Sequence, residues 1–444
     1  MRCAAALLAA VAARANTTAP EWLAAGCYTA EDGVVAPGAC PGGSGRKLLY
    51  DTAHKVEAAR LYGNVHEYAY YYVDLVVGNP PQRTSVILDT GSSVVAFPCK
   101  QCRHCGNHID PNFDFGKSGT AAWVPCGSGC HGSCLDNKCG YHQSYTEGSS
   151  IRGHWFTDDV SIGDMIQRNP PVKAHLGCHD DENRLFYTQR ANGIIGISPR
   201  GGYNTIVKEI VQSPHVDKNV MAICLAEWGG RWVVGGFNTS YHKSEPIWVP
   251  VTLGGYYEVS VEKMMVGSTV VGASRQSFGR TIVDSGTTYT YLPTTTYRAL
   301  KQGVEDYCRS GNKCKGTHSG SCWKIPTKYD GLASFPTISV TISGTAIPWR
   351  PEGYLYHKGD GDQFCYGFDD NGPMHETVLG ATWMVENDVI FDLGAQKMGV
   401  APANCPQYRE RPRGPGGEAR VTWQEIQAEI AAGGPGAEAK AAEE

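Results

Sequence analysis

The sequence lacks two features that would restrict its partners, namely a long apolar run and a strong excess of charge of one sign. Its 444 residues carry a formal net charge of −5, from 39 lysines and arginines against 44 aspartates and glutamates. A nucleic-acid partner therefore has no electrostatic support. Only the alanine- and leucine-rich start is strongly apolar, and it is much shorter than the roughly 20 residues that a membrane span requires. We expect a soluble monomer with no membrane span once this start is removed.

The first segment, residues 1–15, is predicted to be a signal peptide. A basic residue precedes the apolar run, which ends in Ala-Arg-Ala, the small-x-small form of a signal-peptidase site. A disordered alanine-rich leader or a transit peptide is the alternative. Residues 16–64 show little periodicity and are expected to form an N-terminal extension or a short pro-segment. Residues 409–444 are rich in Arg, Pro and Gly and then acidic, which is typical of a disordered tail.

Cysteine is abundant, and this indicates an oxidising compartment. The chain has 17 cysteines, and removing the signal peptide with its one cysteine leaves an even number. We therefore expect the lumen of the secretory pathway, either the endoplasmic reticulum or the endolysosomal system, or secretion. Two sequons occur, at Asn16 and Asn238, of which Asn238 is the better candidate for glycosylation because Asn16 adjoins the predicted cleavage site.

A cysteine-rich stretch at residues 99–139 allows two interpretations. Its spacing, three cysteines separated by two residues each and then four more cysteines, is compatible with zinc binding. The predicted lumenal location favours disulfides instead. The neighbouring histidines also do not have the spacing expected of zinc ligands. We expect no metal and no cofactor.

The pattern of the central region predicts a mainly β protein. Its length suggests two domains, at roughly 150 residues each, and the 54 glycines favour tight turns over long helices. Only two segments, 205–212 and 295–307, have convincing helical spacing. The segments with the alternation or the aromatic and β-branched content of strands are 68–77, 83–88, 152–162, 193–197, 231–236, 256–266 and 280–283.

Two short segments nearly two hundred residues apart are alike. Residues 87–93 read Ile-Leu-Asp-Thr-Gly-Ser-Ser, and residues 282–288 read Ile-Val-Asp-Ser-Gly-Thr-Thr. Each is typical of a buried strand that delivers one carboxylate into a hydroxyl-lined turn. One copy is weak evidence, because an Asp in such a turn often only caps the chain. Two copies predict a duplicated fold in which Asp89 and Asp284 share one site, and paired carboxylates are a recognised device for acid/base chemistry.

These motifs resemble those of the pepsin-like aspartic peptidases over residues 68–405. The resemblance implies a mainly β, bilobal fold of two related β-barrel-like lobes with the active-site cleft between them, residues 65–220 forming one lobe and 221–408 the other. It also implies an aspartic endopeptidase whose substrate is a peptide or protein. Asp89 and Asp284 would hold one water, which the ionised carboxylate deprotonates while the protonated one polarises the scissile carbonyl.

The resemblance assigns roles to the residues around the two aspartates. After each Asp turn an apolar-apolar-Gly segment, at 194–196 and at 378–380, is expected to thread through the catalytic loop. The expected flap is the turn at Tyr145, although Ala96 stands where relatives often carry a Trp that bonds this Tyr. The residues expected to support the dyad are Thr90, Gly91, Ser92, Ser285, Gly286 and Thr287. The residues expected in the flap and in substrate binding are Tyr145, Thr146, Glu147 and Gly148.

The cysteine-rich insert at residues 99–139 resembles that of the nepenthesin-type branch of the family. By that analogy the insert would pair Cys99 with Cys102, Cys105 with Cys178, Cys126 with Cys139, and Cys130 with Cys134. The remaining pairs are expected to be Cys224 with Cys405, Cys308 with Cys314, Cys322 with Cys365, and Cys27 with Cys40, although sequence alone leaves the connectivity open.

Two further expectations concern specificity and activity. The flap and the insert resemble a group of processing peptidases of the endoplasmic reticulum that cleave after a leucine preceded by an arginine two residues upstream. Glu147 is an available acidic group for such an arginine, and its alternative is a solvated hairpin charge. A catalytically inactive pepsin-fold binding or inhibitor protein is the alternative function, which the intact aspartates argue against.

Overall fold

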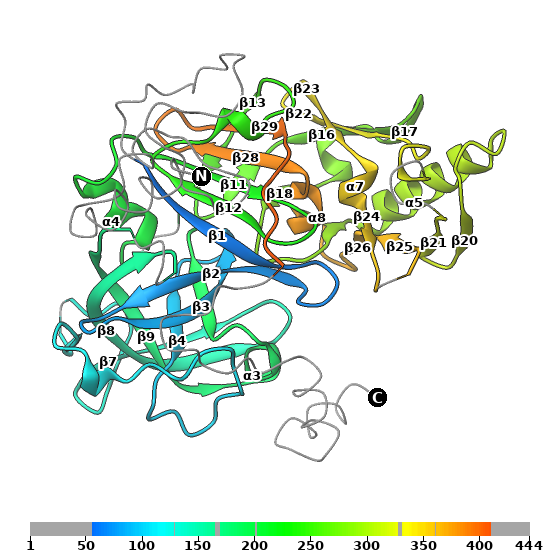
Figure 1. Ribbon diagram of the computed structural model, residues 1–444. Coiled ribbons are helices and arrows are strands. Elements are labelled where there is room, and N and C mark those ends of the chain that lie inside the picture. The colour runs from blue at the N-terminus through cyan, green and yellow to red at the C-terminus, as the bar shows by residue number, and fades with distance from the viewer. Residues whose placement is uncertain are drawn as a thin grey trace, which may run out of the picture.

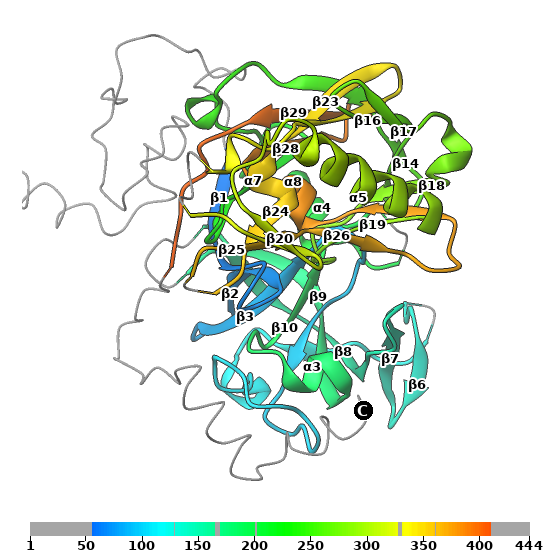
Figure 2. The same cartoon turned by 90° about the vertical axis from the view of Figure 1, so that its right-hand side faces the viewer.

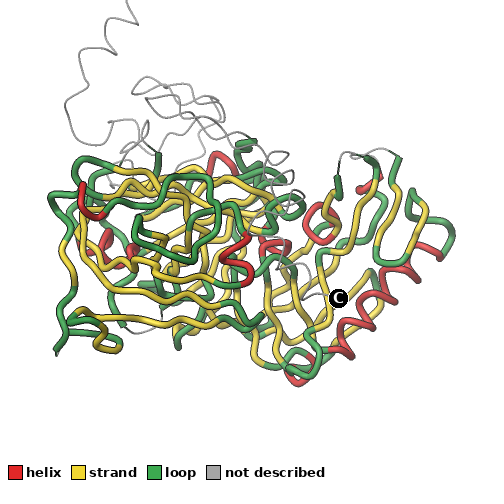
Figure 3. The backbone as a smooth tube through the Cα atoms, turned by 90° about the horizontal axis from the view of Figure 1, so that it is seen from below, coloured by secondary structure: helices red, strands yellow, loops and turns green. Residues whose placement is uncertain are grey.

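The computed structural model describes residues 56–127, 129–164, 169–199, 202–326, 331–359 and 361–409. Strand dominates this part of the chain, and helices are few and mostly short (Figure 3). Two groups of strands lie on either side of a shared central region (Figure 1). One group contains β7, β8 and β9, and the other contains β16, β17 and β21 with the helix α5. The mainly β, two-lobed architecture predicted from the sequence is confirmed.

The largest sheet has 15 strands and runs from the first lobe through the shared region. Its strands are, in spatial order, β13 (Ile247–Pro250), β29 (Lys397–Pro402), β28 (Asn387–Asp392), β11 (Val220–Leu225), β12 (Gly230–Val234), β1 (Glu57–Asn64), β2 (Tyr70–Val77), β3 (Gln82–Asp89), β10 (Gly193–Gly196), β4 (Val95–Pro98), β9 (Val172–Glu182), β8 (Ser150–Ile162), β7 (Lys138–Ser144) and β6 (Ser133–Leu135), with β5 (Ala122–Trp123) paired to β8.

Three smaller sheets build the second lobe. The six-stranded sheet is β14 (Thr252–Leu253), β15 (Tyr257–Val259), β18 (Arg280–Val283), β27 (Glu376–Leu379), β19 (Thr290–Leu292) and β26 (Phe368–Asp370). The two four-stranded sheets are β17 (Thr269–Gly272), β16 (Val261–Val266), β22 (Ile338–Ile342) and β23 (Thr345–Trp349), and β20 (Thr317–Ser319), β21 (Cys322–Lys324), β25 (Gln363–Tyr366) and β24 (Leu355–His357).

The helices are α3 (Arg184–Thr188), α4 (Ile206–Gln212), α5 (Thr294–Arg309), α7 (Pro351–Tyr354) and α8 (Ala381–Met384), with 3₁₀ turns at Phe115–Lys117, Thr239–Tyr241 and Arg275–Ser277. Both predicted helices are confirmed, as α4 and α5. In α5 the buried residues recur with helical spacing, for example at Thr296, Leu300 and Val304. This face packs against β16 and β17, where Val271 lies directly over Gly303. Among the described residues, no helix is long and apolar enough to cross a membrane.

The predicted N-terminal boundary is wrong. The sequence predicts that residues 57–64 belong to the N-terminal extension. In the structure these residues form β1, which is buried throughout and pairs with both β12 and β2. The segment does not have the pattern of a buried strand because it contains two charged residues. Inside the fold, Oε1 of Glu57 lies 3.0 Å from Nδ1 of His215, and Nη1 of Arg60 lies 3.5 Å from Oδ2 of Asp164. The predicted signal peptide, the remaining extension, the sequon at Asn16, the Cys27–Cys40 pair and the tail lie outside the described residues.

The strand predicted over 256–266 is divided in two. The chain changes sheet at Ser260, since β15 pairs with β18 while β16 pairs with β22. The strands predicted over 68–77 and 83–88 are confirmed as β2 and β3, which form a hairpin that is antiparallel from Tyr72 opposite Ile87 to Val77 opposite Gln82. This hairpin places Asp89 at the end of a strand in the middle of the sheet.

Candidate active site

Each aspartate lies at the end of a buried strand that is held by a parallel partner. In the first lobe, β10 pairs with β3 so that Gly196 lies beside Asp89, and the N–H of Ile197 donates to the carbonyl of Asp89 at 2.9 Å. In the second lobe, β27 pairs with β18, and the N–H of Asp284 donates to the carbonyl of Leu379 at 3.0 Å. Both threading segments predicted from the sequence therefore lie beside the aspartate turns.

The two turns are joined by a reciprocal set of four hydrogen bonds. The hydroxyl of Thr90 donates to the carbonyl of Val283 at 2.9 Å and accepts from the N–H of Ser285 at 2.8 Å. The hydroxyl of Ser285 donates to the carbonyl of Leu88 at 2.7 Å and accepts from the N–H of Thr90 at 3.1 Å. Both hydroxyl side chains are buried. The bonds relate the lobes by a near twofold symmetry and fix the distance between the two carboxyl groups.

Each carboxylate accepts one backbone and one hydroxyl hydrogen bond from its own turn. Asp89 accepts from the N–H of Gly91 at 2.7 Å and from the hydroxyl of Ser92. Asp284 accepts from the N–H of Gly286 at 2.9 Å and from the hydroxyl of Thr287 at 2.7 Å. These donors orient both carboxyl groups, and those at Asp89 act to lower its pKa.

The two glycines allow the halves to approach each other. A Cβ atom added at Gly91 would lie 2.6 Å from Oδ2 of Asp284, and one added at Gly286 would overlap the carboxyl group of Asp89. Each lobe thus places bare backbone against the carboxyl group of the other lobe. Any side chain at either position would push the two aspartates apart.

Burial and mutual repulsion control protonation of the pair. Asp89 is only 5% exposed. Burial first, and then the neighbouring charge of Asp284, raise the pKa of Asp89 well above its usual range, against the lowering effect of the Ser92 and Gly91 hydrogen bonds. Two carboxyl groups this close share one proton, so the pair titrates as a unit and offers one acid and one base.

The expected flap is the turn between β7 and β8. The N–H of Tyr145 donates to the carbonyl of Ser149 at 2.9 Å, and the N–H of Gly148 donates back to the carbonyl of Tyr145 at 3.0 Å. The hydroxyl of Tyr145 is buried, and its pKa is raised well above the usual value by burial and then by the charge of Asp89. The side chain of Tyr145 therefore lies near Asp89, and both residues line the same cleft.

The support of the flap tyrosine differs from the family pattern. Ala96 is fully buried and carries no hydrogen-bonding group on its side chain. The ring of Tyr145 instead packs against the ring of Phe186 in α3, with 5.0 Å between the ring centres. This contact could not be predicted from the sequence, because α3 is a helix of only five residues without a recognisable motif.

A cleft of about 790 Å³ contains both aspartates and is lined by both lobes. Of the four predicted flap residues, Tyr145, Thr146 and Glu147 line it, whereas Gly148 is not part of its lining. Most of the apolar wall of the cleft could not be predicted from the sequence. Two of the residues in this wall are large hydrophobic side chains that are exposed to solvent, Leu185 at 55% and Met374 at 43%. The other apolar and aromatic residues of the wall are Tyr68, Tyr70, Ile87, Phe186, Ile194, Tyr256, Ile282, Tyr291 and Val378.

Apart from the dyad, the wall of the cleft carries more acidic than basic side chains. Its ionisable side chains other than the dyad and the tyrosines are Glu67, Glu147, Glu376, Arg190 and Arg280. Both arginines are engaged, because Arg190 lies over the ring of Tyr68 at 4.6 Å and Arg280 donates to the carboxylate of Glu258. The ion pairs described for this part of the chain leave Glu67 and Glu147 without a basic partner. With three glutamates against two arginines, the wall has a small excess of negative charge.

The four disulfides predicted in and next to the insert are wrong. The structure pairs Cys99 with Cys178, Cys102 with Cys105, Cys126 with Cys134, and Cys130 with Cys139, in place of Cys99–Cys102, Cys105–Cys178, Cys126–Cys139 and Cys130–Cys134. The first difference arises because β4 runs parallel to β9, which brings the end of β4 beside Cys178. In the other, Cys134 and Cys139 lie opposite each other across the β6–β7 hairpin, and the preceding loop brings Cys126 to Cys134 and Cys130 to Cys139.

The three pairs predicted in the second half of the chain are confirmed. They are Cys224–Cys405, Cys308–Cys314 and Cys322–Cys365. Among the described residues, no group of three or more His, Cys, Asp or Glu side chains is arranged to hold a metal ion. Every cysteine in the described ranges is disulfide-bonded.

The predicted glycosylation at Asn238 is contradicted by its burial. The residue is 2% exposed, its side-chain oxygen accepts from the N–H of Ser240 at 3.0 Å, and its side-chain nitrogen is buried without a hydrogen-bond partner. A glycan on that nitrogen would have to pass through the protein interior. The Asn here caps the 3₁₀ turn at Thr239–Tyr241 instead.

Comparison with known proteins places these features in context. A family model described as eukaryotic aspartyl protease matches residues 70–403. Aspartic protease 5 of Toxoplasma gondii is 34% identical over 422 residues, which cover 81% of this chain and 39% of that protein. Plasmepsin V of Plasmodium falciparum is 26% identical over 452 residues, which cover 80% of this chain and 75% of that protein. The aspartic proteinase nepenthesin-2 of Nepenthes gracilis is 22% identical, covering 76% of this chain and 78% of that protein.

Proposed function

The chain belongs to the eukaryotic aspartyl protease family, and from that premise we propose that it is an endopeptidase that hydrolyses extended polypeptide segments in the secretory pathway. The observation that carries the proposal is the pair of aspartates, each with its own amide and hydroxyl donor, held together by reciprocal hydrogen bonds at the floor of a two-lobed cleft. Seven disulfides among the described residues support the oxidising compartment.

The proposed mechanism uses a water held between Asp89 and Asp284. The ionised carboxylate takes a proton from this water as its oxygen attacks the scissile carbonyl carbon, while the protonated carboxyl group donates to the carbonyl oxygen. The resulting tetrahedral intermediate collapses when the leaving nitrogen receives a proton from the dyad. Tyr145 covers the reacting groups and excludes bulk water from them, which strengthens these electrostatic interactions.

Ser92→Ala is expected to move the basic limb of the activity profile to higher pH. Burial and the charge of Asp284 make Asp89 the carboxyl group that keeps the shared proton, and the hydroxyl of Ser92 lowers its pKa; removing this hydroxyl raises the pKa further, so the dyad keeps its acid to higher pH. At the alkaline end of the working range kcat/KM should rise roughly tenfold relative to wild type. The measurement is the pH dependence of kcat/KM, with Thr287→Ser as the control because it keeps a hydroxyl beside Asp284. A basic limb that does not move would refute this role of Ser92.

The substrate class follows from the acidic cleft and the similarity to plasmepsin V. We propose a processing peptidase that binds a basic side chain close to the scissile bond, with Glu147 as its partner at the flap. The direct test is digestion of a peptide library by the purified protein at acidic and near-neutral pH, with cleavage sites identified by mass spectrometry. Discrete internal cleavages are expected, and binding of peptides without any cleavage would favour the inactive pepsin-fold alternative.

Glu147→Gln is expected to reduce kcat/KM for library peptides with an arginine near the cleavage site by about tenfold. For peptides with a neutral residue at that position the change should be less than about twofold, because no charge pair is lost. Glu376→Gln is the matched control, since it removes one acidic group from the opposite wall of the same cleft. An equal effect of Glu147→Gln on both peptide classes would exclude Glu147 as the partner of the arginine.

A further inference from the structure

The short helix α3 (Arg184–Thr188) contacts the flap without touching the dyad. It lies beside β8 in the lobe that carries the flap hairpin (Figure 2). The residue before it, Asn183, is bonded to the base of the flap. The N–H of Ser150 donates to the side-chain oxygen of Asn183 at 2.6 Å, and the side-chain nitrogen of Asn183 donates to the hydroxyl of Ser150 at 2.9 Å. The N–H of Asn183 also donates to the carbonyl of Ser150 at 3.2 Å.

Arg184 extends this contact to the tip of the flap. Its Nη1 donates to the carbonyl of Glu147 at 3.4 Å, and a Cβ atom added at Gly148 would lie 2.7 Å from the same nitrogen. The guanidinium group therefore covers the flap turn. Arg184 has a φ of +47°, a conformation that residues with a Cβ atom rarely adopt. This unfavourable backbone conformation thus occurs at the residue whose side chain contacts the flap.

The next two residues of α3 continue the contact. The N–H of Leu185 donates to the hydroxyl of Ser149 at 3.3 Å, and the ring of Phe186 packs against the ring of Tyr145. Four consecutive residues, 183–186, thus hold the flap at its base, tip and tyrosine. We call this segment the flap strap.

One buried histidine of the cysteine-rich insert connects the chain before the strap with the chain after α3. Nε2 of His108 lies 3.0 Å from Oε2 of Glu182, directly before the strap, and Nδ1 lies 3.1 Å from the carbonyl oxygen of Gln189, directly after α3. His108 thus connects the side chain of Glu182, before α3, with the carbonyl directly after α3. The side chains of His108 and Glu182 are fully buried.

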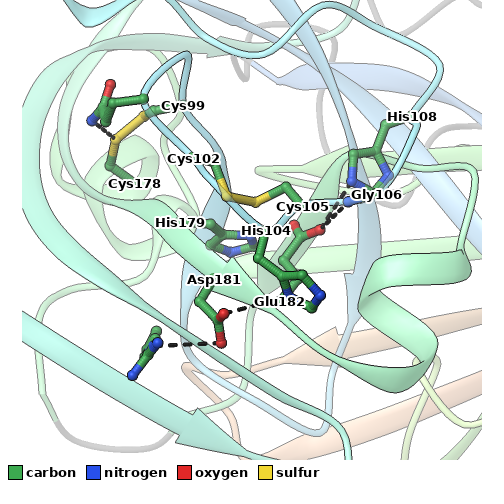
Figure 4. The surroundings of a disulfide bond; sticks show 12 residues. Cys99, Cys102, His104, Cys105, Gly106, His108, Cys178, His179, Asp181 and Glu182 are labelled. Carbon is green, nitrogen blue, oxygen red and sulfur yellow. Dashed lines mark hydrogen bonds and ion pairs between the residues drawn. A yellow bond between two sulfur atoms is a disulfide. The ribbon is translucent and has the colours of Figure 1, made fainter. Parts of the chain in front are cut away.

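Glu182 makes two further contacts, one to the insert and one within β9. It accepts from the N–H of Gly106 at 3.1 Å and from Nδ1 of His179 at 2.7 Å (Figure 4). Burial acts to raise the pKa of Glu182, but the hydrogen bonds and charges of His108 and His179 outweigh it and lower the pKa to about 2. The carboxylate therefore stays ionised over any ordinary working pH. Gly106 directly follows the Cys102–Cys105 disulfide, which holds this loop in shape.

We propose that the insert controls the closure of the flap, with His108 positioning the flap strap and Arg184 positioning the flap turn. The inference rests on the proposed peptidase function and adds a specific task for the insert. Substrate binds productively only under a closed flap, so a loosened strap lowers the population of the competent state and weakens apparent affinity by the same factor. The chemical step is unaffected, because the dyad and its donors are unchanged.

Arg184→Asn tests the proposal, since Asn tolerates a positive φ but is too short to reach the flap turn. We expect KM to rise roughly fivefold with kcat changed by less than about twofold, because one hydrogen bond that favours the closed flap is lost. Amide hydrogen exchange of residues 145–149 should become faster, and Arg184→Lys should restore part of the affinity. Gln396→Asn is the matched control, as an exposed residue with a φ of +53° in the other lobe.

His108→Gln tests the link to the insert. It should change KM and the exchange of residues 145–149 in the same direction as Arg184→Asn, because His108 contacts Glu182 and Gln189 on either side of α3. Unchanged KM with unchanged flap exchange in Arg184→Asn would overturn the proposal, and so would a loss of kcat at constant KM. If His108→Gln does not fold, Arg184→Asn still decides the outcome. Hydrogen exchange needs no catalysis, so a wild-type protein that cleaves nothing would refute the peptidase function separately.

Discussion

Asp89→Asn and Asp284→Asn are each expected to reduce kcat/KM for peptide hydrolysis by at least about a thousandfold. The amide has almost the shape of the carboxyl group, so the turns and their reciprocal hydrogen bonds should persist. It cannot take a proton from the attacking water or give one to the carbonyl oxygen. Because the two carboxyl groups share one proton and act as a unit, the double variant should be hardly less active than either single one.

The measurement is the steady-state hydrolysis of a peptide selected from the library, with the single and double variants at matched protein concentration. Asp136→Asn is the control, because Asp136 is exposed and lies in a turn at a φ of +47° that Asn also tolerates. An intact fold is verified by the absence of free thiols and by an unchanged circular dichroism spectrum. A folded single variant that keeps a tenth of the wild-type activity would refute the shared-dyad mechanism.

The aspartate turns could be predicted from the sequence because the information is local. A buried strand, an Asp, a small hydroxyl residue and a Gly follow one another in each half, and the repeat implies a twofold arrangement. The same holds for the threading segment beside each turn and for α5, whose buried face is set by residues three to four positions apart. In these elements the local pattern and the tertiary structure agree.

Disulfide connectivity and β1 could not be predicted because both depend on pairing between distant segments. Cys99 pairs with Cys178 because β4 and β9 are parallel neighbours, and no feature near Cys99 specifies that neighbour. Glu57 and Arg60 make β1 look polar, although the fold supplies partners for both. Helix α3 lacks a motif for the same reason, since its role arises from contacts with the flap and with His108.

Glu57→Gln is expected to stabilise the folded protein at neutral pH by about 1–3 kcal/mol. Glu57 is 1% exposed in β1, and one of its carboxyl oxygens has no hydrogen-bond partner among the described residues. Burial raises its pKa from 4.5 to about 8. A glutamine of the same length keeps a neutral, hydrogen-bonding group beside His215 and avoids the cost of holding a proton on a buried acid.

The sign of the pH dependence follows from proton binding. Between the unfolded value of 4.5 and the folded value of about 8, the folded protein holds one proton on Glu57 that the unfolded chain has released. The contribution of Glu57 to stability is therefore complete below the unfolded pKa and decreases as pH rises through this window, until it is lost above the folded pKa. The advantage of Glu57→Gln should be near zero at pH 4 and should grow steadily towards pH 8.

Denaturant unfolding of both proteins across pH 4–8, with all disulfides intact, measures this difference directly. Glu245→Gln is the matched control, because Glu245 is exposed and the substitution should change stability by less than about 0.5 kcal/mol at every pH. A constant advantage of Glu57→Gln across the range would assign the effect to packing and not to ionisation. The predicted dependence also implies that β1, which joins the two lobes through β2 and β12, is held most firmly under acidic conditions.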